Sequence, residues 1–159
     1  MFEAQTEWIS PESFPDLKDH KYIAIDLETR DPGLKSKGSG ALVNEGEIIG
    51  IAVAVEGWSG YYSFGHKEGN FFDESAVMRW IKDVCALPCV KLFHNAMYDV
   101  CWLRAYGVQI NGHIVDTMVM ASLVDENRLW YSLNSLSIDY LGQIKDETAL
   151  RAAADKAGI

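Results

Sequence analysis

The sequence predicts an α/β fold: a mixed sheet in which three antiparallel strands lead into parallel strand–helix units, flanked by helices. Three observations predict it. An apolar run over 48–55 is followed by Glu56-Gly57 and a second apolar run, as in a hairpin. Apolar strand-like runs then alternate with amphipathic segments, as in parallel strand–helix units. The chain has 159 residues, which suits one domain with a hydrophobic core.

The elements are expected in the order β-β-β-α-β-α-β-α-α, behind an N-terminal arm over 1–20 that precedes a domain over 21–159. Asp73 is a plausible N-cap for the first long helix, whose apolar residues form one stripe. Pro32 and several glycines predict a loop over 29–44. Strands are predicted at 21–27, 48–55, 60–64 and 90–93, with a short extended segment at 108–115, interrupted by Gly112, as the fifth; helices are predicted at 73–85, 95–106, 116–124 and 132–140. The Ala-rich segment over 145–156 is expected to add one more helix after these nine elements.

The chain is acidic, with 14 Lys and Arg against 23 Asp and Glu and a formal net charge of −9. This charge disfavours tight nonspecific binding to duplex nucleic acid, which requires neutralised phosphates. It does not exclude a nucleic-acid enzyme, because metal-binding carboxylates contribute negative charge that bound cations reverse locally.

The cysteines and the apolar segments also limit the protein class. Three cysteines are too few and odd in number for a disulfide framework, so Cys85, Cys89 and Cys101 are expected to be free. No apolar stretch approaches the ~20 residues of a membrane span, and the N-terminus lacks a signal-peptide pattern. We therefore expect a cytoplasmic location and no membrane partner.

Carboxylates follow two of the predicted strands. Asp26 and Glu28 share one face of the first strand, roughly 7 Å apart at the backbone. Like charges this close raise each other's pKa unless a cation lies between them. Asp99 follows the strand over 90–93, about one helical turn after Asn95. Converging carboxylates suit Mg²⁺ or Mn²⁺ and indicate phosphodiester chemistry with two ions.

Two motifs carry a resemblance to a known family. Ile25-Asp26-Leu27-Glu28-Thr29 resembles the first motif of the DEDD exonuclease superfamily, and His94-Asn95-Ala96-Met97-Tyr98-Asp99 resembles the second. The stretches over 115–118 and 131–136 resemble the proofreading domain of family A DNA polymerases. The resemblance covers roughly residues 20 to 145.

The resemblance implies a ribonuclease H-like fold and metal-dependent 3′→5′ exonuclease activity on single-stranded DNA 3′ ends. Asp26, Glu28 and Asp99 would be the catalytic metal ligands. Thr29 and Asn95 would hold the terminal nucleotide, and His94 either joins them or is a buried strand-end imidazole. The implied partner is a polymerase domain or downstream segment, in bacterial or viral replication machinery.

The family also has a third motif, Tyr-x-x-x-Asp or His-x-x-x-x-Asp. Neither pattern occurs after the second motif. The chain is therefore expected to end before the third motif and to be weak or inactive alone. Two alternatives stay open: an RNA 3′ exonuclease similar to ribonuclease D, and a catalytically incomplete module that binds nucleic acid.

Other residues allow two interpretations each. Asp116 is either a helix N-cap or a substitute fourth ligand. The cations of the 29–44 segment either contact the phosphate backbone or lie on a solvated loop; they are Arg30, Lys35 and Lys37. The hairpin aromatics either pack the hairpin or form a base-stacking platform; they are Trp58, Tyr61, Tyr62 and Phe64.

Overall fold

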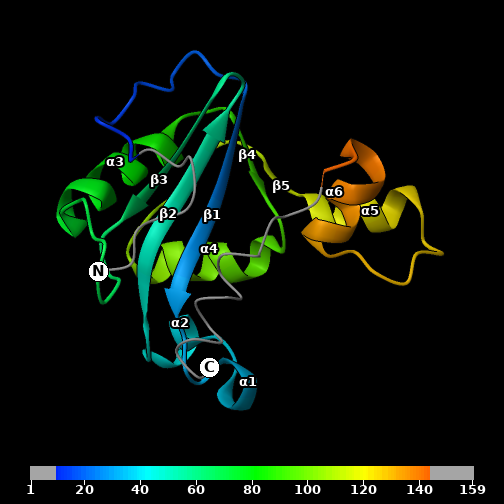
Figure 1. Cartoon of the computed structure of the whole chain (residues 1–159), viewed down its shortest axis with the longest axis horizontal. Helices are drawn as coiled ribbons and strands as arrows, with labels where there is room; N and C mark the ends of the chain where they lie inside the picture. Colours follow the sequence, from blue (N-terminus) through cyan, green and yellow to red (C-terminus); the bar gives the residue numbers. More distant parts are fainter. Residues whose placement is uncertain (1–9, 144–159) are drawn as a thin grey trace. The chain divides into compact units, whose positions relative to one another are not determined.

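A five-stranded mixed sheet organises the protein, whose computed structural model describes residues 10–143 (Figure 1). The strand order is β3-β2-β1-β4-β5. The β1–β2 and β2–β3 pairs are antiparallel, and the β1–β4 and β4–β5 pairs are parallel. The predicted mixed sheet is thereby confirmed. The strands are β1 (Tyr22–Arg30), β2 (Glu47–Val55), β3 (Trp58–Ser63), β4 (Val90–Phe93) and β5 (Ile114–Asp116).

The described chain divides into two compact units, residues 10–120 and residues 121–143. The first contains the sheet, two short helices and two longer ones. The helices of the whole described chain are α1 (Leu34–Lys37), α2 (Gly40–Val43), α3 (Glu74–Ala86), α4 (Ala96–Ala105), α5 (Thr117–Val124) and α6 (Leu133–Leu141).

The hydrophobic core lies on one face of the sheet. Side chains alternate along β1, so Ile23, Ile25 and Leu27 are buried while Asp26 and Glu28 are exposed. The buried face packs with apolar residues of α3 and α4 in a single cluster. Figure 1 shows α4 crossing behind β1 and β2. Each fully buried aliphatic side chain contributes about 1.5–3 kcal/mol to the stability of the fold. This burial fixes the register of β1 and so determines which face of the sheet carries Asp26 and Glu28.

Aromatic side chains tie the segment before β1 to this core. Tyr62 of β3 is fully buried and stacks on Phe14, with ring centroids 5.2 Å apart. Trp80 of α3 donates from Nε1 to the Pro15 carbonyl at 3.0 Å, and Leu17 is buried. The expected packing role of Tyr62 is confirmed, and the described part of the predicted arm, residues 10–20, packs on the domain.

The predicted loop over 29–44 is partly wrong. β1 continues to Arg30 because a register shift after Glu28 keeps the strand paired with β2 as far as Arg30↔Glu47. α1 and α2 follow, and a single helical turn is too short to show periodicity in the sequence. Arg30 forms an ion pair with Glu47, and Lys37 with Glu45. These two cations are therefore already neutralised.

The extended segment predicted over 108–115 is a strand only in its last part, since β5 covers Ile114–Asp116, and the predicted interruption at Gly112 is confirmed. The backbone of Asn111 donates instead to the Cys85 carbonyl at 2.9 Å. Gly112 then turns the chain with a φ of +76°, against the Pro88 and Cys89 carbonyls. A side chain at Gly112 would clash with that backbone, so the strand begins only after the turn.

The helix ends follow local capping. Asp73 accepts from the Ala76 N–H at 2.9 Å, which confirms it as the N-cap of α3. Ser132 accepts from the Ser135 N–H at 3.3 Å at the start of α6. The predicted helix over 145–156 lies outside the described residues. Among the residues described, no helix is long and apolar enough to cross a membrane.

Candidate active site

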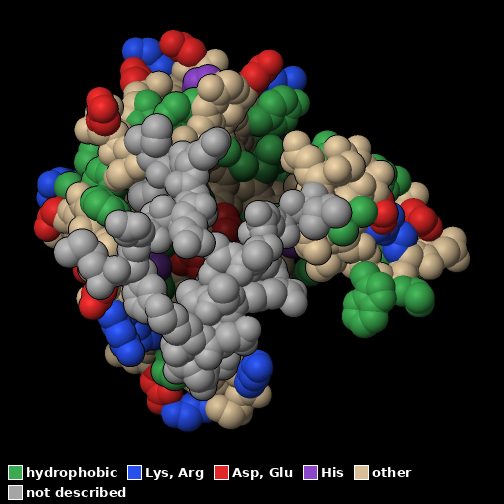
Figure 2. Space-filling model, in the orientation of Figure 1, with side chains coloured by type: hydrophobic (Ala, Val, Ile, Leu, Met, Phe, Trp, Pro, Cys, Tyr) green, Lys and Arg blue, Asp and Glu red, His purple; other side chains and the backbone are tan. Residues whose placement is uncertain are grey.

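The β1 carboxylates lie on the sheet face opposite the core. Asp26 pairs in register with Ala52 of β2, and Glu28 with Gly50. Both carboxylates are exposed, and the Tyr61 ring of β3 lies over Gly50 beside Glu28. Figure 2 shows acidic side chains near the centre of the face seen in this view. The alternation predicted from the sequence is confirmed.

Asp99 contacts β1 beyond the point where β4, the parallel neighbour of β1, stops pairing with it. β4 pairs with β1 only over Tyr22–Ala24. Beyond that point the Leu27 N–H donates to Asp99 Oδ1 at 3.1 Å. Leu27 stands between Asp26 and Glu28 in the chain, so this hydrogen bond brings the third carboxylate to the backbone that carries the other two. The structure therefore places the Asp99 carboxylate of the second motif against the backbone of the first, and the metal-ligand roles of the three carboxylates stay a prediction.

The charge of Asp99 is poorly stabilised in the metal-free protein. Asp99 is 4% exposed. Burial, and then the negative charge of Asp26, raise its pKa to about 7, although the Leu27 N–H favours the ionised form. A cation at this place would relieve both effects. Carboxylates are the ligands that hard divalent cations prefer, so Asp99 and its neighbour Asp26 have the chemistry that such an ion requires.

The three carboxylates do not form a finished ligand set. Within residues 10–143, no group of three or more His, Cys, Asp or Glu side chains is gathered so that it could hold a metal ion. After burial, the negative charge of Asp26 is the next cause of the raised pKa of Asp99, and a cation between two such carboxylates would offset their repulsion.

Asp116 anchors the second motif. Its Oδ1 accepts from the N–H groups of Asn95 at 3.1 Å and Met118 at 2.9 Å, and its Oδ2 accepts from Ala96 at 2.8 Å. Burial opposes ionisation of Asp116, but these backbone donors outweigh it and lower the pKa. The N-cap interpretation is therefore confirmed, and both carboxylate oxygens are engaged by the backbone of α4 and α5.

The same anchor explains the conformation of Asn95. This residue has φ 65° and ψ 53°, the left-handed region that asparagine tolerates better than most residues. Its side chain makes no capping bond and is exposed. The turn from β4 into α4 therefore presents the Asn95 amide to solvent and turns Asp99 toward β1.

The other predicted substrate-binding residues, Thr29 and His94, are less exposed than Asn95. The Thr29 hydroxyl lies 2.6 Å from the Tyr98 hydroxyl. His94 Nδ1 lies 2.9 Å from the Thr117 hydroxyl, which itself donates to the Phe93 carbonyl at 3.1 Å. Since the Thr117 hydroxyl donates its single proton to that carbonyl, it accepts from His94 Nδ1–H.

Sequence reasoning missed Tyr98. Its hydroxyl contacts Thr29 and donates to Asp31 Oδ2 at 3.2 Å, while Asp31 also accepts from the Gly40 N–H at 2.9 Å. The network links the end of β1 to α4 and α2. No local pattern indicated this role, because the contact of Tyr98 with Thr29 joins residues that are 69 positions apart in the sequence.

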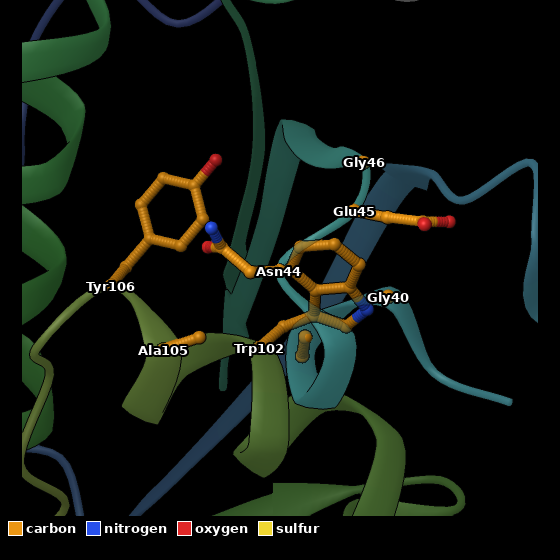
Figure 3. A pocket seen from close by; sticks show the side chains of 8 residues that line it. Gly40, Asn44, Glu45, Gly46, Trp102, Ala105 and Tyr106 are labelled. Carbon is orange, nitrogen blue, oxygen red and sulfur yellow. The ribbon is translucent and has the colours of Figure 1, made fainter.

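A separate hollow of about 310 Å³ lies between α2, the loop that follows it and α4 (Figure 3). Trp102, Ala105 and Tyr106 line one side, and residues of 40–46 line the other. None of the three site carboxylates lines this hollow. It is therefore distinct from the site where the motifs meet.

Comparison with known proteins decides the family. The sequence profile of a 3′-5′ exonuclease family matches residues 4–157. The chain belongs to this 3′-5′ exonuclease family. It is therefore a member of a family of phosphodiester hydrolases that generally use divalent metals, as the resemblance implied.

The sequence relatives of this exonuclease chain are DNA polymerases. It is 30% identical over 161 residues to a DNA-directed DNA polymerase of Pseudomonas phage M6, covering 97% of this chain and 24% of the polymerase. The chain spans a quarter or less of the length of the curated relatives it matches. Those relatives are phage DNA polymerases and a bacterial DNA polymerase I.

Solved structures confirm the ribonuclease H-like fold. Brucella melitensis NrnC with bound Mg²⁺ is similar with a TM-score of 0.61 at 13% identity, covering 84% of this chain and 61% of that one. Escherichia coli RNase D, an exoribonuclease, is similar with a TM-score of 0.59 at 17% identity, covering 85% of this chain and 32% of that one. At these identities the likeness establishes the fold alone.

Proposed function

We propose that this exonuclease chain removes nucleotides from the 3′ end of single-stranded DNA and works as the proofreading part of a phage or bacterial DNA polymerase. Asp26, Glu28 and Asp99 hold two divalent ions, Mg²⁺ or Mn²⁺. The observation that carries the proposal is the hydrogen bond from the Leu27 N–H to Asp99, which brings the third carboxylate to the strand that bears the other two. The polymerase relatives support the assignment to replication.

The carboxylates have complementary roles in this proposal. Asp26 and Glu28 are exposed and can turn toward an ion and a phosphate above the sheet. Asp99 is buried and held by the backbone, so it fixes the position of the ion. When bound, two divalent ions supply an ionised water and stabilise the leaving 3′ oxygen.

The terminal nucleotide would lie between the two motifs. Asn95 is the strongest candidate for contact with it, because its amide is exposed and makes no capping bond. Thr29 would contribute through a hydroxyl oriented by Tyr98. His94 would contribute through Nε2, because its Nδ1 is bound to Thr117.

The test uses the full 159-residue chain with Mn²⁺ and a 5′-labelled single-stranded DNA oligonucleotide. We expect slow shortening from the 3′ end, which stops when the last linkages are phosphorothioates and when Asp26 is replaced by Ala. Asp83→Asn is the matched control, since Asp83 is an exposed acid of α3 away from the site. Equal cleavage by the wild type and Asp26→Ala would refute the site assignment.

A second candidate function is 3′ trimming of RNA. Escherichia coli RNase D, an exoribonuclease, has the same fold, which is compatible with this alternative. The same assay with an RNA of identical sequence separates the two, and faster shortening of RNA would reverse the proposed order. Binding of either oligonucleotide without any shortening would support instead a module that binds nucleic acid and does not cut it.

A further inference from the structure

A tyrosine of β3 stands on the same sheet face as the site carboxylates. Asp26 pairs with Ala52, and Ala52 pairs with Tyr61, so all three side chains point the same way. The Tyr61 ring leans over Gly50, since a Cβ built on Gly50 would lie 2.0 Å from the Tyr61 hydroxyl. Gly50 is the register partner of Glu28. The phenol therefore lies one strand away from Glu28.

The Tyr61 hydroxyl holds a histidine at the rim of this face. It lies 2.6 Å from His66 Nε2. The backbone of His66 is fixed in turn by Asn70, which accepts from the His66 N–H at 2.8 Å and donates to the His66 carbonyl at 2.6 Å. The imidazole is thus fixed at both its ring and its backbone, and it is only half-buried.

The buried and acidic surroundings of Tyr61 keep its hydroxyl protonated, so the Tyr61–His66 pair can donate a hydrogen bond. Burial, followed by the charges of Glu28 and Asp26, raises the pKa of Tyr61 to about 12, so the hydroxyl keeps its proton at neutral pH. When that hydroxyl donates to Nε2, the neutral ring carries its own proton on Nδ1. The remaining N–H is then available to an anion.

We propose that His66, oriented by Tyr61, binds a nonbridging oxygen of a backbone phosphate next to the phosphate that is cleaved. The cleaved phosphate belongs above the carboxylates of β1. The Tyr61 hydroxyl lies above Gly50 of β2, about one strand spacing of 4.8 Å from β1, which is a step toward the neighbouring nucleotide. Contacts to backbone phosphates fix the position of a nucleic-acid strand on a protein without reading its base sequence. Tyr61 is a positioning residue that acts through His66. The proposal rests on the proposed function.

The experiment measures binding and cleavage separately. Binding of a fluorescent single-stranded DNA is followed by anisotropy with Ca²⁺ in place of Mg²⁺, and a gel checks that the oligonucleotide stays intact. His66→Ala is expected to weaken binding about tenfold, Tyr61→Phe about threefold, and His66→Gln less than His66→Ala because it keeps an N–H donor. In the Mn²⁺ assay KM should rise while kcat changes less than twofold.

Neutral linkages identify the phosphate. A methylphosphonate placed at each of the last four linkages in turn should weaken wild-type binding, and at one linkage beside the cleaved one it should remove the difference between the wild type and His66→Ala. His113→Ala is the matched control, because His113 is an exposed histidine just before β5 and should leave binding unchanged. Circular dichroism confirms that each variant is folded.

The outcomes separate this inference from the proposed function. Equal binding by the wild type and His66→Ala would overturn the His66 contact and leave the exonuclease site intact. A His66→Ala difference that survives every methylphosphonate would also overturn it. A wild-type chain that binds no oligonucleotide would contradict the proposed function and this inference together.

Discussion

Replacing Asp99 with Asn should stabilise the metal-free protein. The carboxylate is buried beside Asp26, and its pKa is about 7 in the fold against 3.8 in an exposed chain. Each pKa unit corresponds to about 1.36 kcal/mol, so the shift sets an upper limit of about 4 kcal/mol on the penalty for ionised Asp99. Asn removes the charge and keeps an oxygen that can accept the Leu27 N–H. We expect a gain of roughly 1 to 4 kcal/mol at pH 8.

The raised pKa of Asp99 determines how the stability of the protein changes with pH. Between about pH 4 and pH 7 the folded protein keeps a proton on Asp99 that the unfolded chain has lost, so this group lowers stability as pH rises. Above pH 7 the penalty is constant, and below pH 4 it is absent. The difference between Asp99→Asn and the wild type should therefore grow from pH 4 to pH 8.

The assay is urea unfolding followed by tryptophan fluorescence, using the five tryptophans of the chain, in EDTA at pH 5 and pH 8. Asp83→Asn, an exposed acid in α3, is the control and should change stability by less than 0.5 kcal/mol, the range of about ±0.5 kcal/mol typical of surface substitutions. Mg²⁺ or Mn²⁺ should stabilise the wild type more than Asp99→Asn. If Asp99→Asn gains nothing over the wild type at pH 8, the reasoning about the buried charge is wrong.

Three further substitutions test how the site is held. Asp116→Ala removes the acceptor of the N–H groups that open α4, and we expect urea unfolding to show a loss of about 1–2 kcal/mol; an unchanged midpoint would contradict the anchor role. Gly50→Ala places a Cβ 2.0 Å from the Tyr61 hydroxyl and should cost about 1–3 kcal/mol, whereas a neutral effect would show that the ring moves freely. Lys91 is fully buried and donates to three carbonyls, so Lys91→Met should destabilise by about 2–4 kcal/mol, and a stabilised variant would refute that view.

The elements that the sequence predicted well are those with a strong periodic pattern or a cap. α3 was predicted to within one residue at each end because its apolar stripe and the Asp73 cap agree. β4 was predicted with its bounds. By contrast, α1 and α2 are single turns without periodicity, and the chain after α4 is set by the long-range bond from Asn111 to Cys85, which no local pattern reports.

The site was predictable to the same extent. Alternation along β1 placed Asp26 and Glu28 on one face, and the second motif identified Asp99. The burial of Asp99 was not predictable, because it depends on β4 ending at Phe93 and leaving the Leu27 N–H for a side chain. The place of Tyr61 beside the carboxylates depends on the register of the β2–β3 hairpin, which the sequence indicated only as a hairpin.

The most direct test of the account is whether the three carboxylates bind one set of divalent ions. Isothermal titration calorimetry with Mn²⁺ should detect binding by the wild type and by Asp83→Asn. It should show binding at least tenfold weaker for Asp26→Asn and for Asp99→Asn, since each loses a ligand charge. Equal Mn²⁺ affinity in all four proteins would contradict a metal site between β1 and α4.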